Sequence, residues 1–156
     1  MTRQLPISLH GGSKGQARTQ FAALCYRTRR GKVQVLLVTS RKRGRWIMPK
    51  GWPMDGRTPA ESAAQEAWEE AGVRGAASDL CLGVYSYAKE REEEGPLTCL
   101  AMLYPVKVVS VAKTYPECKQ RRRRWVSRKK AAQLVVEPEL SRMILEFDPK
   151  ARVKLA

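Results

Sequence analysis

Three glutamates, Glu66, Glu69 and Glu70, are spaced so that their side chains share one surface of an α-helix. Three carboxylates crowded together repel one another unless a cation lies between them. Mg²⁺ suits such a place, because it prefers oxygen ligands and leaves coordination positions open for the phosphate groups of a substrate. The spacing therefore predicts a divalent-metal site that acts on a phosphorylated compound. The alternative is a solvated acidic helix face.

The sequence marks both ends of the helix that would carry these glutamates. Thr58 is a suitable N-cap, Pro59 fits the first helical position, and Glu61 completes a capping box. Gly72 suits the left-handed residue that follows the last turn. An apolar stripe between these ends is formed by Ala60, Ala63, Ala64, Ala67, Trp68 and Ala71. We therefore expect a helix that packs closely against a sheet through small residues, with the first and last of the three glutamates at the border of the contact.

Basic residues dominate the chain ahead of this helix. The net charge is +15, and residues 1–54 hold 12 Lys and Arg but no acid. Arginine can pair with a phosphate through two hydrogen bonds, and lysine offers a point charge. The predicted substrate-binding residues are the cluster just before the helix: Arg41, Lys42, Arg43, Arg45 and Lys50. Of the arginines at 121–124, at most two would reach the same site if that run is a strand. A solvated basic surface is the alternative.

The rest of the chain predicts an α+β fold. Strands are expected at 21–27, 33–41, 46–49, 79–89 and 96–111, with a short strand at 121–126 and helices at 127–135 and 138–147. This order indicates a mixed sheet between helices. With 156 residues the chain is long enough for one domain, predicted at 20–150, behind a flexible basic arm at 1–19.

Composition also bears on the location of the protein. The four cysteines lack metal-binding spacing, which predicts free thiols in a reducing compartment. No apolar run reaches the length of a membrane span, and the first twenty residues lack the apolar core of a secretory signal. We therefore expect a cytoplasmic protein, although the acid-free arm at 1–19 has some of the character of an organelle transit peptide.

The loop and helix together resemble the signature of the Nudix hydrolase superfamily, G-x5-E-x7-R-E-U-x-E-E-x-G-U, where U is a bulky aliphatic residue. The matching positions are Gly51, Glu66, Glu69, Glu70, Gly72 and Val73. The resemblance implies an α/β/α sandwich with a mixed sheet between helices, over roughly residues 20–147. The stretch WIMPKGW and the later run CKQRRRRWVSRKKAAQLV are most similar to the diphosphoinositol polyphosphate phosphohydrolase branch.

Three positions depart from the signature. Arg57 stands where the family has Glu, Gln65 where it has Arg, and Ala67 where it has a larger aliphatic residue. In the family the first Glu and the Arg are thought to form a salt bridge that supports the loop and helix. Loss of one partner alone would leave an unpaired charge, which is costly if buried, whereas a joint loss can be accommodated. We therefore expect Arg57 or Gln65 to bond to Glu61 or Asp55 instead.

The resemblance implies a catalytic and metal-binding set for a Mg²⁺-dependent hydrolase, with Mn²⁺ as a second candidate ion. Glu66, Glu69 and Glu70 would bind the metal with the main-chain carbonyl of Gly51, and Glu66 is the expected base for the attacking water. A further carboxylate often comes from a later loop, for which the candidates are Glu92, Glu93, Glu94 and Glu117. The expected substrate is a diphosphoinositol polyphosphate or a dinucleoside polyphosphate.

Two other functions are compatible with the same residues. A Nudix scaffold weakened by Arg57 and Gln65 would bind RNA or another polyanion, and removal of pyrophosphate from an RNA 5′ end combines both activities. Nucleic-acid binding is disfavoured, because aromatic residues make up 7% of the chain and no RNA-recognition motif is present. The sequence leaves the oligomeric state open.

Overall fold

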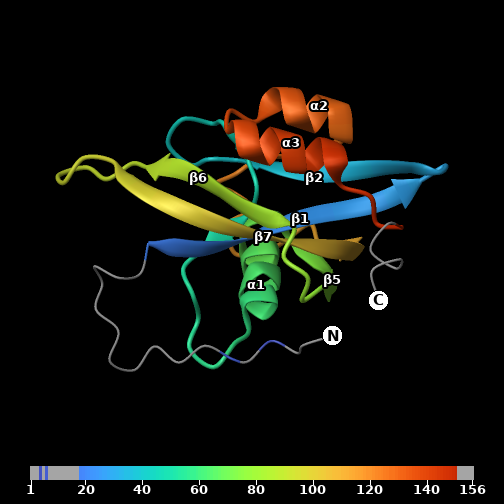
Figure 1. Cartoon of the computed structure of the whole chain (residues 1–156), viewed down its shortest axis with the longest axis horizontal. Coiled ribbons are helices and arrows are strands. Elements are labelled where there is room, and N and C mark those ends of the chain that lie inside the picture. Colours follow the sequence, from blue (N-terminus) through green and yellow to red (C-terminus); the bar gives the residue numbers. More distant parts are fainter. Residues whose placement is uncertain (1–3, 5, 7–17, 151–156) are drawn as a thin grey trace.

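The computed structural model describes residues 4, 6 and 18–150, which form one mixed β-sheet between helices (Figure 1). Helix α1 (Pro59–Ala71) covers one face of the sheet, and α2 (Arg128–Leu134) and α3 (Pro138–Glu146) cover the other. The predicted α+β sandwich is confirmed. The predicted arm at 1–19 lies largely outside the described residues. No helix within the described part of the chain is long and apolar enough to span a membrane.

Three long strands form the centre of the sheet. β1 (Thr19–Arg29) pairs antiparallel with β2 (Lys32–Thr39) and parallel with β7 (Leu97–Val111). Arg30 and Gly31 connect β1 to β2 with φ angles of 53° and 75°, the pattern of a two-residue turn that matches the twist of a hairpin. Residues 21–26 and 35–39 are buried without alternation, because helices cover both faces of the sheet.

Two short strands lie where β1 and β2 stop pairing with each other. β3 (Trp46–Ile47) pairs with the end of β2, and β4 (Lys50–Gly51) pairs with the start of β1. The single strand predicted at 46–49 is wrong, because Pro49 has no N–H with which to continue a ladder. Its carbonyl instead accepts a hydrogen bond from the Ala23 N–H at 2.9 Å. The hydrogen bond from Ala23 and the pairing with β1 together hold β4 in the sheet next to α1.

Helix α1 begins and ends where the sequence predicted. The Thr58 hydroxyl accepts from the Glu61 N–H at 3.1 Å, and the Glu61 carboxylate accepts from the Thr58 N–H at 2.8 Å. Gly72 follows the last turn with φ 69°. The buried alanines of the helix are Ala60, Ala63, Ala67 and Ala71. Ala64 and Trp68 were predicted to join them but are only half-buried. The Arg74 guanidinium stacks on the Trp68 ring at 4.0 Å from its centre.

The outer strands differ more from the prediction. β6 (Gly83–Lys89) pairs with the first half of β7 and is shorter than the strand predicted at 79–89. β5 (Val73–Ala77) pairs with the second half of β7 and was not predicted, because its sequence VRGAA has no clear apolar alternation. β8 (Arg123–Ser127) pairs with the outer edge of β2. Ser127 caps α2 as predicted, since its hydroxyl accepts from the Lys130 N–H at 3.0 Å.

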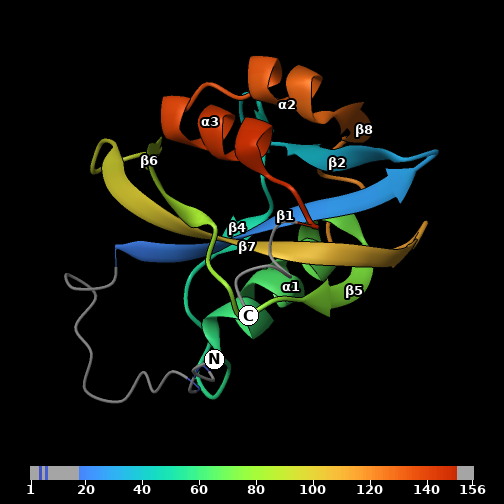
Figure 2. The ribbon, with the colours of Figure 1, turned by 45° about the vertical axis from the view of Figure 1, so that its right-hand side comes forward.

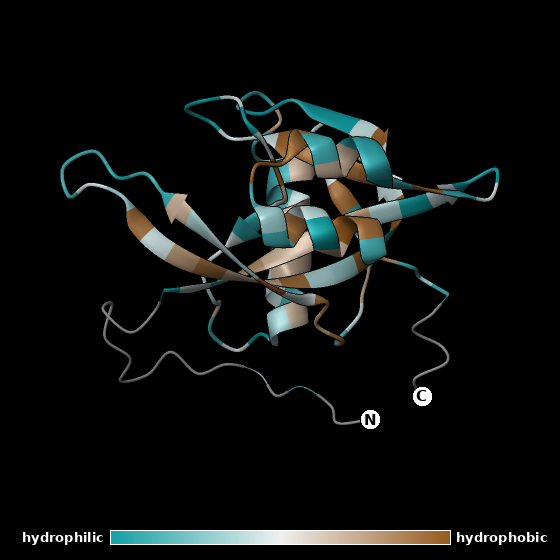
Figure 3. Ribbon diagram, turned by 45° about the horizontal axis from the view of Figure 1, so that its top comes forward, coloured by the Kyte–Doolittle hydropathy of each residue, from teal (hydrophilic) through white to brown (hydrophobic). Residues whose placement is uncertain are grey.

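The sheet lies between α1 on one face and α2 and α3 on the other (Figure 2). It separates two hydrophobic cores. The core beneath α2 and α3 contains larger side chains, including Leu24, Leu37, Leu140, Ile144 and Phe147. The core beneath α1 is closed by alanines, so this helix approaches the sheet closely. The tips of the β1–β2 and β6–β7 hairpins are hydrophilic (Figure 3). All four cysteines are free thiols, as predicted.

Candidate active site

The carboxyl group of Glu66 lies directly against the main chain of Gly51 in β4. A Cβ atom placed on Gly51 would come within 3.0 Å of the Glu66 carboxyl carbon and of both its oxygens, closer than real Cβ contacts allow. Glycine at this position therefore leaves the room in which the carboxyl group sits. The close approach of α1 to the sheet thus brings together two of the predicted metal ligands.

Glu70 lies one turn further along α1 and is buried, with its side chain 5% exposed. Its Oε1 atom has no hydrogen-bond partner among the described residues. A guanidinium nitrogen of Arg121 lies 3.7 Å from this oxygen, which is within ion-pair range but too long for a hydrogen bond. A buried carboxylate oxygen without a hydrogen bond is costly, so this atom is suited to binding a cation.

The pKa values of Glu66 and Glu70 are both raised. Burial is the largest cause of the rise in the Glu66 pKa to about 8, followed by the charges of Glu70 and Glu69. Burial also raises the Glu70 pKa to about 7, and the charges of Arg121 and Lys50 oppose that rise. A divalent cation between the two carboxyl groups would favour the charged form of each.

Glu69 is connected through its main chain to the loop before β8. Its carbonyl accepts a hydrogen bond from the Glu117 N–H at 2.9 Å. The Glu117 carboxylate accepts from Arg121 Nε at 2.9 Å, and its charge contributes to the raised pKa values of Glu66 and Glu70. Glu117 is therefore the loop carboxylate that reaches the site. The other three candidates lie elsewhere: Glu92 pairs with Lys42, Glu94 pairs with Arg91, and Glu93 is exposed.

The donor set suits a divalent cation, although it is not fully assembled. Among the described residues, no three His, Cys, Asp or Glu side chains converge as a ready-made metal site. The fit rests on the paired carboxyl groups of Glu66 and Glu70, on the unsatisfied Glu70 oxygen, and on the space that Gly51 leaves open. Hard oxygen donors of this kind are those that Mg²⁺ and Mn²⁺ take.

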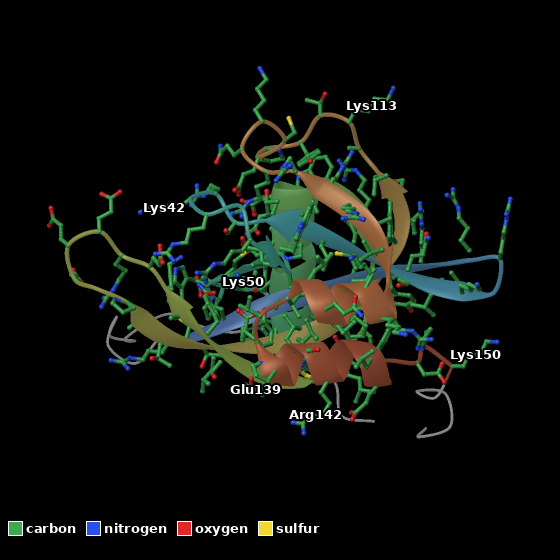
Figure 4. The ribbon with its side chains drawn as sticks, turned by 90° about the horizontal axis from the view of Figure 1, so that it is seen from above. Lys42, Lys50, Lys113, Glu139, Arg142 and Lys150 are labelled. Atoms are coloured by element: carbon green, nitrogen blue, oxygen red, sulfur yellow. The ribbon has the colours of Figure 1, made fainter. Side chains whose placement is uncertain are left out.

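A cavity of about 300 Å³ opens beside Glu70. Lys42 and Lys50, which are labelled in Figure 4, belong to its lining. All five of the predicted substrate-binding residues line it: Arg41, Lys42, Arg43, Arg45 and Lys50. The other charged residues in its wall are Lys89, Arg121, Glu70, Glu90 and Glu137. Among the described residues, seven cationic side chains thus face three acidic ones. The cavity therefore favours an anion that carries several charges.

Three residues of β6 line the cavity and were not predicted: Tyr87, Ala88 and Lys89. Lys50 Nζ lies 4.5 Å from the centre of the Tyr87 ring, and the Tyr87 hydroxyl donates a hydrogen bond to Gln20. Burial lowers the Lys50 pKa to about 8, while the charges of Glu70 and Glu137 act to raise it. Alternation in the strand shows that Tyr87 and Lys89 share a face. It does not show that this face borders the cavity, because that depends on the pairing of β6 with β7.

Of the arginines at 121–124, Arg121 lines the cavity, within the predicted limit of two. Its Nη1 atom also donates to the Thr39 carbonyl at 3.0 Å, so the side chain is held on several sides. Arg123 serves a different purpose, because its Nη1 atom donates to the Ala71 carbonyl at 2.7 Å, at the end of α1. A cation at a helix C-terminus is favourable.

Arg57 and Gln65 lie away from the cavity, in a shallow hollow beside α1 that they share with Glu61 and Trp68. The expected bond from Arg57 or Gln65 to Glu61 or Asp55 stays a prediction. The Glu61 pKa is lowered mainly by the hydrogen bond from the Thr58 main chain, and the charge of Arg57 is the smallest of the causes. The two departures therefore change the outer side of the helix and leave Glu66 and Glu70 in place.

Comparisons with known proteins agree with this geometry. Residues 18–147 match a family model described as the NUDIX domain. "Nudix hydrolase 12, mitochondrial" of Arabidopsis thaliana is 36% identical over 119 residues, which are 74% of this chain and 59% of that protein. "Diphosphoinositol polyphosphate phosphohydrolase 3-beta" of Homo sapiens is 38% identical over 71 residues, which are 46% of this chain and 43% of that protein. The matches span between 51% and 66% of the length of four plant relatives.

Solved structures share the fold. The binary complex of a Caenorhabditis elegans Ap4A hydrolase aligns with a TM-score of 0.62 at 18% identity, covering 88% of this chain and 98% of that one. A NUDIX hydrolase from Nitrosomonas europaea aligns with a TM-score of 0.62 at 20% identity, covering 83% and 86%. The sandwich fold, the glycine loop with its glutamate helix and the match over residues 18–147 agree, and the chain belongs to the NUDIX family.

Proposed function

We propose that this chain is a divalent-metal-dependent hydrolase that cleaves a phosphoanhydride bond in a small molecule with several phosphates. The substrate class is a diphosphoinositol polyphosphate or a dinucleoside polyphosphate. The observation that carries the proposal is the position of Glu70, whose unsatisfied buried oxygen stands at the wall of a cavity lined by seven cationic side chains of the described chain. The relatives named as diphosphoinositol polyphosphate phosphohydrolases support it.

The carboxylates would hold Mg²⁺ or Mn²⁺ where Glu66 and Glu70 meet Gly51, with Glu69 turned inward as a third ligand. When bound, the ion would stabilise negative charge on the phosphate oxygens and make an attached water more acidic. Glu66 is the proposed base that orients the attacking water and takes its proton. A bound divalent cation would favour the charged form of Glu66, which is the form that can accept a proton.

The basic residues would hold the phosphates that do not react. Arg121 and Lys50 are the least exposed of them and lie closest to Glu70, so we assign them to the phosphate next to the bond that breaks. Arg41, Arg43 and Arg45 are exposed and would bind phosphates further out. A substrate with one or two phosphates leaves most of these cations unused, which favours a substrate with more.

The second candidate is a scaffold that binds a polyanion without turning it over. The observation in its favour is that the carboxylates do not converge as a ready-made metal site among the described residues. A purely anion-binding protein gains nothing from Glu66 and Glu70 beside its cavity, which favours the hydrolase.

Phosphate release with Mg²⁺, with Mn²⁺ and with EDTA tests the proposal. The panel would hold an inositol pyrophosphate, diadenosine penta- and hexaphosphate, ADP-ribose and a triphosphorylated RNA. We expect metal-dependent turnover of one of the first two classes. We expect a loss of at least about 100-fold in Glu70→Gln and little change in the control Glu93→Gln. Binding without turnover of any compound would favour the anion-binding scaffold.

A cytoplasmic location stays a prediction. Imaging of the tagged full chain would test it.

A further inference from the structure

The acidic loop between β6 and β7 pairs with two cations that line the cavity. Arg43 Nη2 lies 2.7 Å from a Glu90 carboxylate oxygen, and Lys42 Nζ lies 3.2 Å from a Glu92 oxygen. The two cations come from the loop between β2 and β3, so the ion pairs connect two segments far apart in the sequence (Figure 4, Lys42). The sequence KEREEEG reads as a solvated loop, but the fold places two of its carboxylates at a phosphate-binding wall.

Exposure divides the cavity into an inner and an outer part. The Arg121 and Glu70 side chains are 9% and 5% exposed and form the inner part. Lys42 and Arg43 are 58% and 57% exposed and form the outer part. The two ion pairs are thus confined to the mouth, where water screens them. Exposed pairs of this kind add little to folding stability, so their main effect is on the availability of the two cations.

We propose that Lys42 and Arg43 form an outer phosphate-binding position, and that Glu90 and Glu92 make it selective by competing with the ligand for these cations. The inference rests on the proposed function of the same cavity. A phosphate displaces a carboxylate because it carries more charge and offers more acceptor oxygens. A short ligand held at Lys50 and Arg121 leaves the pairs intact. A ligand with a longer row of phosphates reaches the mouth and breaks them.

Removal of the competing carboxylates should therefore raise affinity only for ligands that reach the mouth. Each exposed pair contributes up to about 1 kcal/mol, which is about a fivefold change in affinity. In the variant Glu90→Gln with Glu92→Gln, we expect medium-chain inorganic polyphosphate to bind about threefold to tenfold more tightly. Pyrophosphate, which is short enough to remain in the inner part, should bind with unchanged affinity.

Titration calorimetry in EDTA measures this without any turnover. The matched control is Glu93→Gln with Glu94→Gln. It also removes two negative charges from this loop, but it leaves Lys42 and Arg43 paired. A second background, Lys42→Gln with Arg43→Gln, should abolish the effect of the Glu90 and Glu92 changes. An equal gain in polyphosphate affinity in the control would mean that the affinity depends only on the net charge of the loop, and would overturn the proposal. Unchanged or undetectable polyphosphate binding in the Glu90 and Glu92 variant would overturn it as well.

The calorimetric result is separate from the proposed hydrolase activity. If the affinities change as expected but no compound is turned over, the outer position stands and the hydrolase function fails. If a polyphosphorylated substrate is turned over but the affinities do not change, the function stands and Glu90 and Glu92 have no part in selectivity.

Discussion

Replacing Glu70 with glutamine should stabilise the metal-free protein at alkaline pH. Burial raises the pKa of this carboxyl group from 4.5 to about 7. The folded protein therefore keeps a proton that the unfolded chain has already lost at intermediate pH. A group of this kind costs nothing well below pH 4.5, where both states are protonated, and it destabilises the fold increasingly between about pH 4.5 and 7, above which the cost is constant. Glutamine has nearly the same shape and no charge, so it removes that cost.

The magnitude follows from the raised pKa and from the charges around it. A rise from 4.5 to about 7 corresponds to about 3 kcal/mol of lost stability once the pH exceeds both values. The pKa of about 7 already includes the charges of Arg121 and Lys50, which favour the carboxylate and oppose the effect of burial. We expect Glu70→Gln to be more stable than the wild type by about 3 kcal/mol near pH 8.5, and equal to it below about pH 4.

Urea unfolding in EDTA at both pH values measures the difference, with Glu93→Gln as a control for an exposed glutamate. Addition of Mg²⁺ at about 100 times its dissociation constant should stabilise the wild type by roughly 3 kcal/mol and the variant by much less. If Glu70→Gln is instead less stable than the wild type near pH 8.5, the ion pairs outweigh the cost of burial. Glu70 would then be a structural anchor, and the reasoning that makes it a metal ligand would be refuted.

Three further substitutions test the geometry. Gly51→Ala places a Cβ atom against the Glu66 carboxyl group, so Mg²⁺ should no longer raise the melting temperature, and an unchanged rise would contradict the site. Thr58→Ala removes the hydroxyl that caps α1 and should lower the free energy of unfolding by about 1 kcal/mol in urea titrations, with Ser127→Ala as the comparison at α2. Gly72→Ala places an alanine in a left-handed backbone conformation and brings its Cβ atom within 3.0 Å of Tyr115. It should cost more than about 1 kcal/mol of unfolding free energy, and a smaller loss would mean that the ring moves aside.

The parts of the fold that the sequence predicted are those encoded by neighbouring residues. The capping box of Thr58 and Glu61 is complete within four residues, and Gly72 ends the helix for reasons of backbone geometry alone. The same holds for the spacing of Glu66, Glu69 and Glu70. β5 was missed because an edge strand of small residues is held by its pairing with β7, and that partner is distant in the sequence.

The electrostatics of the site depend on contacts between distant segments, and for that reason composition alone did not predict them. Lys89 and Tyr87 reach the cavity through the pairing of β6 with β7, and Arg121 reaches Glu70 through the loop that precedes β8. A basic residue near a glutamate in the sequence has many possible partners, and the free energy differences among exposed pairs are small. For a buried charged group, the packing of the surrounding side chains decides which residue forms the ion pair, because only one partner fits in the space. The inner cations are therefore fixed by the fold, whereas the outer cations, Lys42 and Arg43, remain able to exchange a carboxylate for a phosphate.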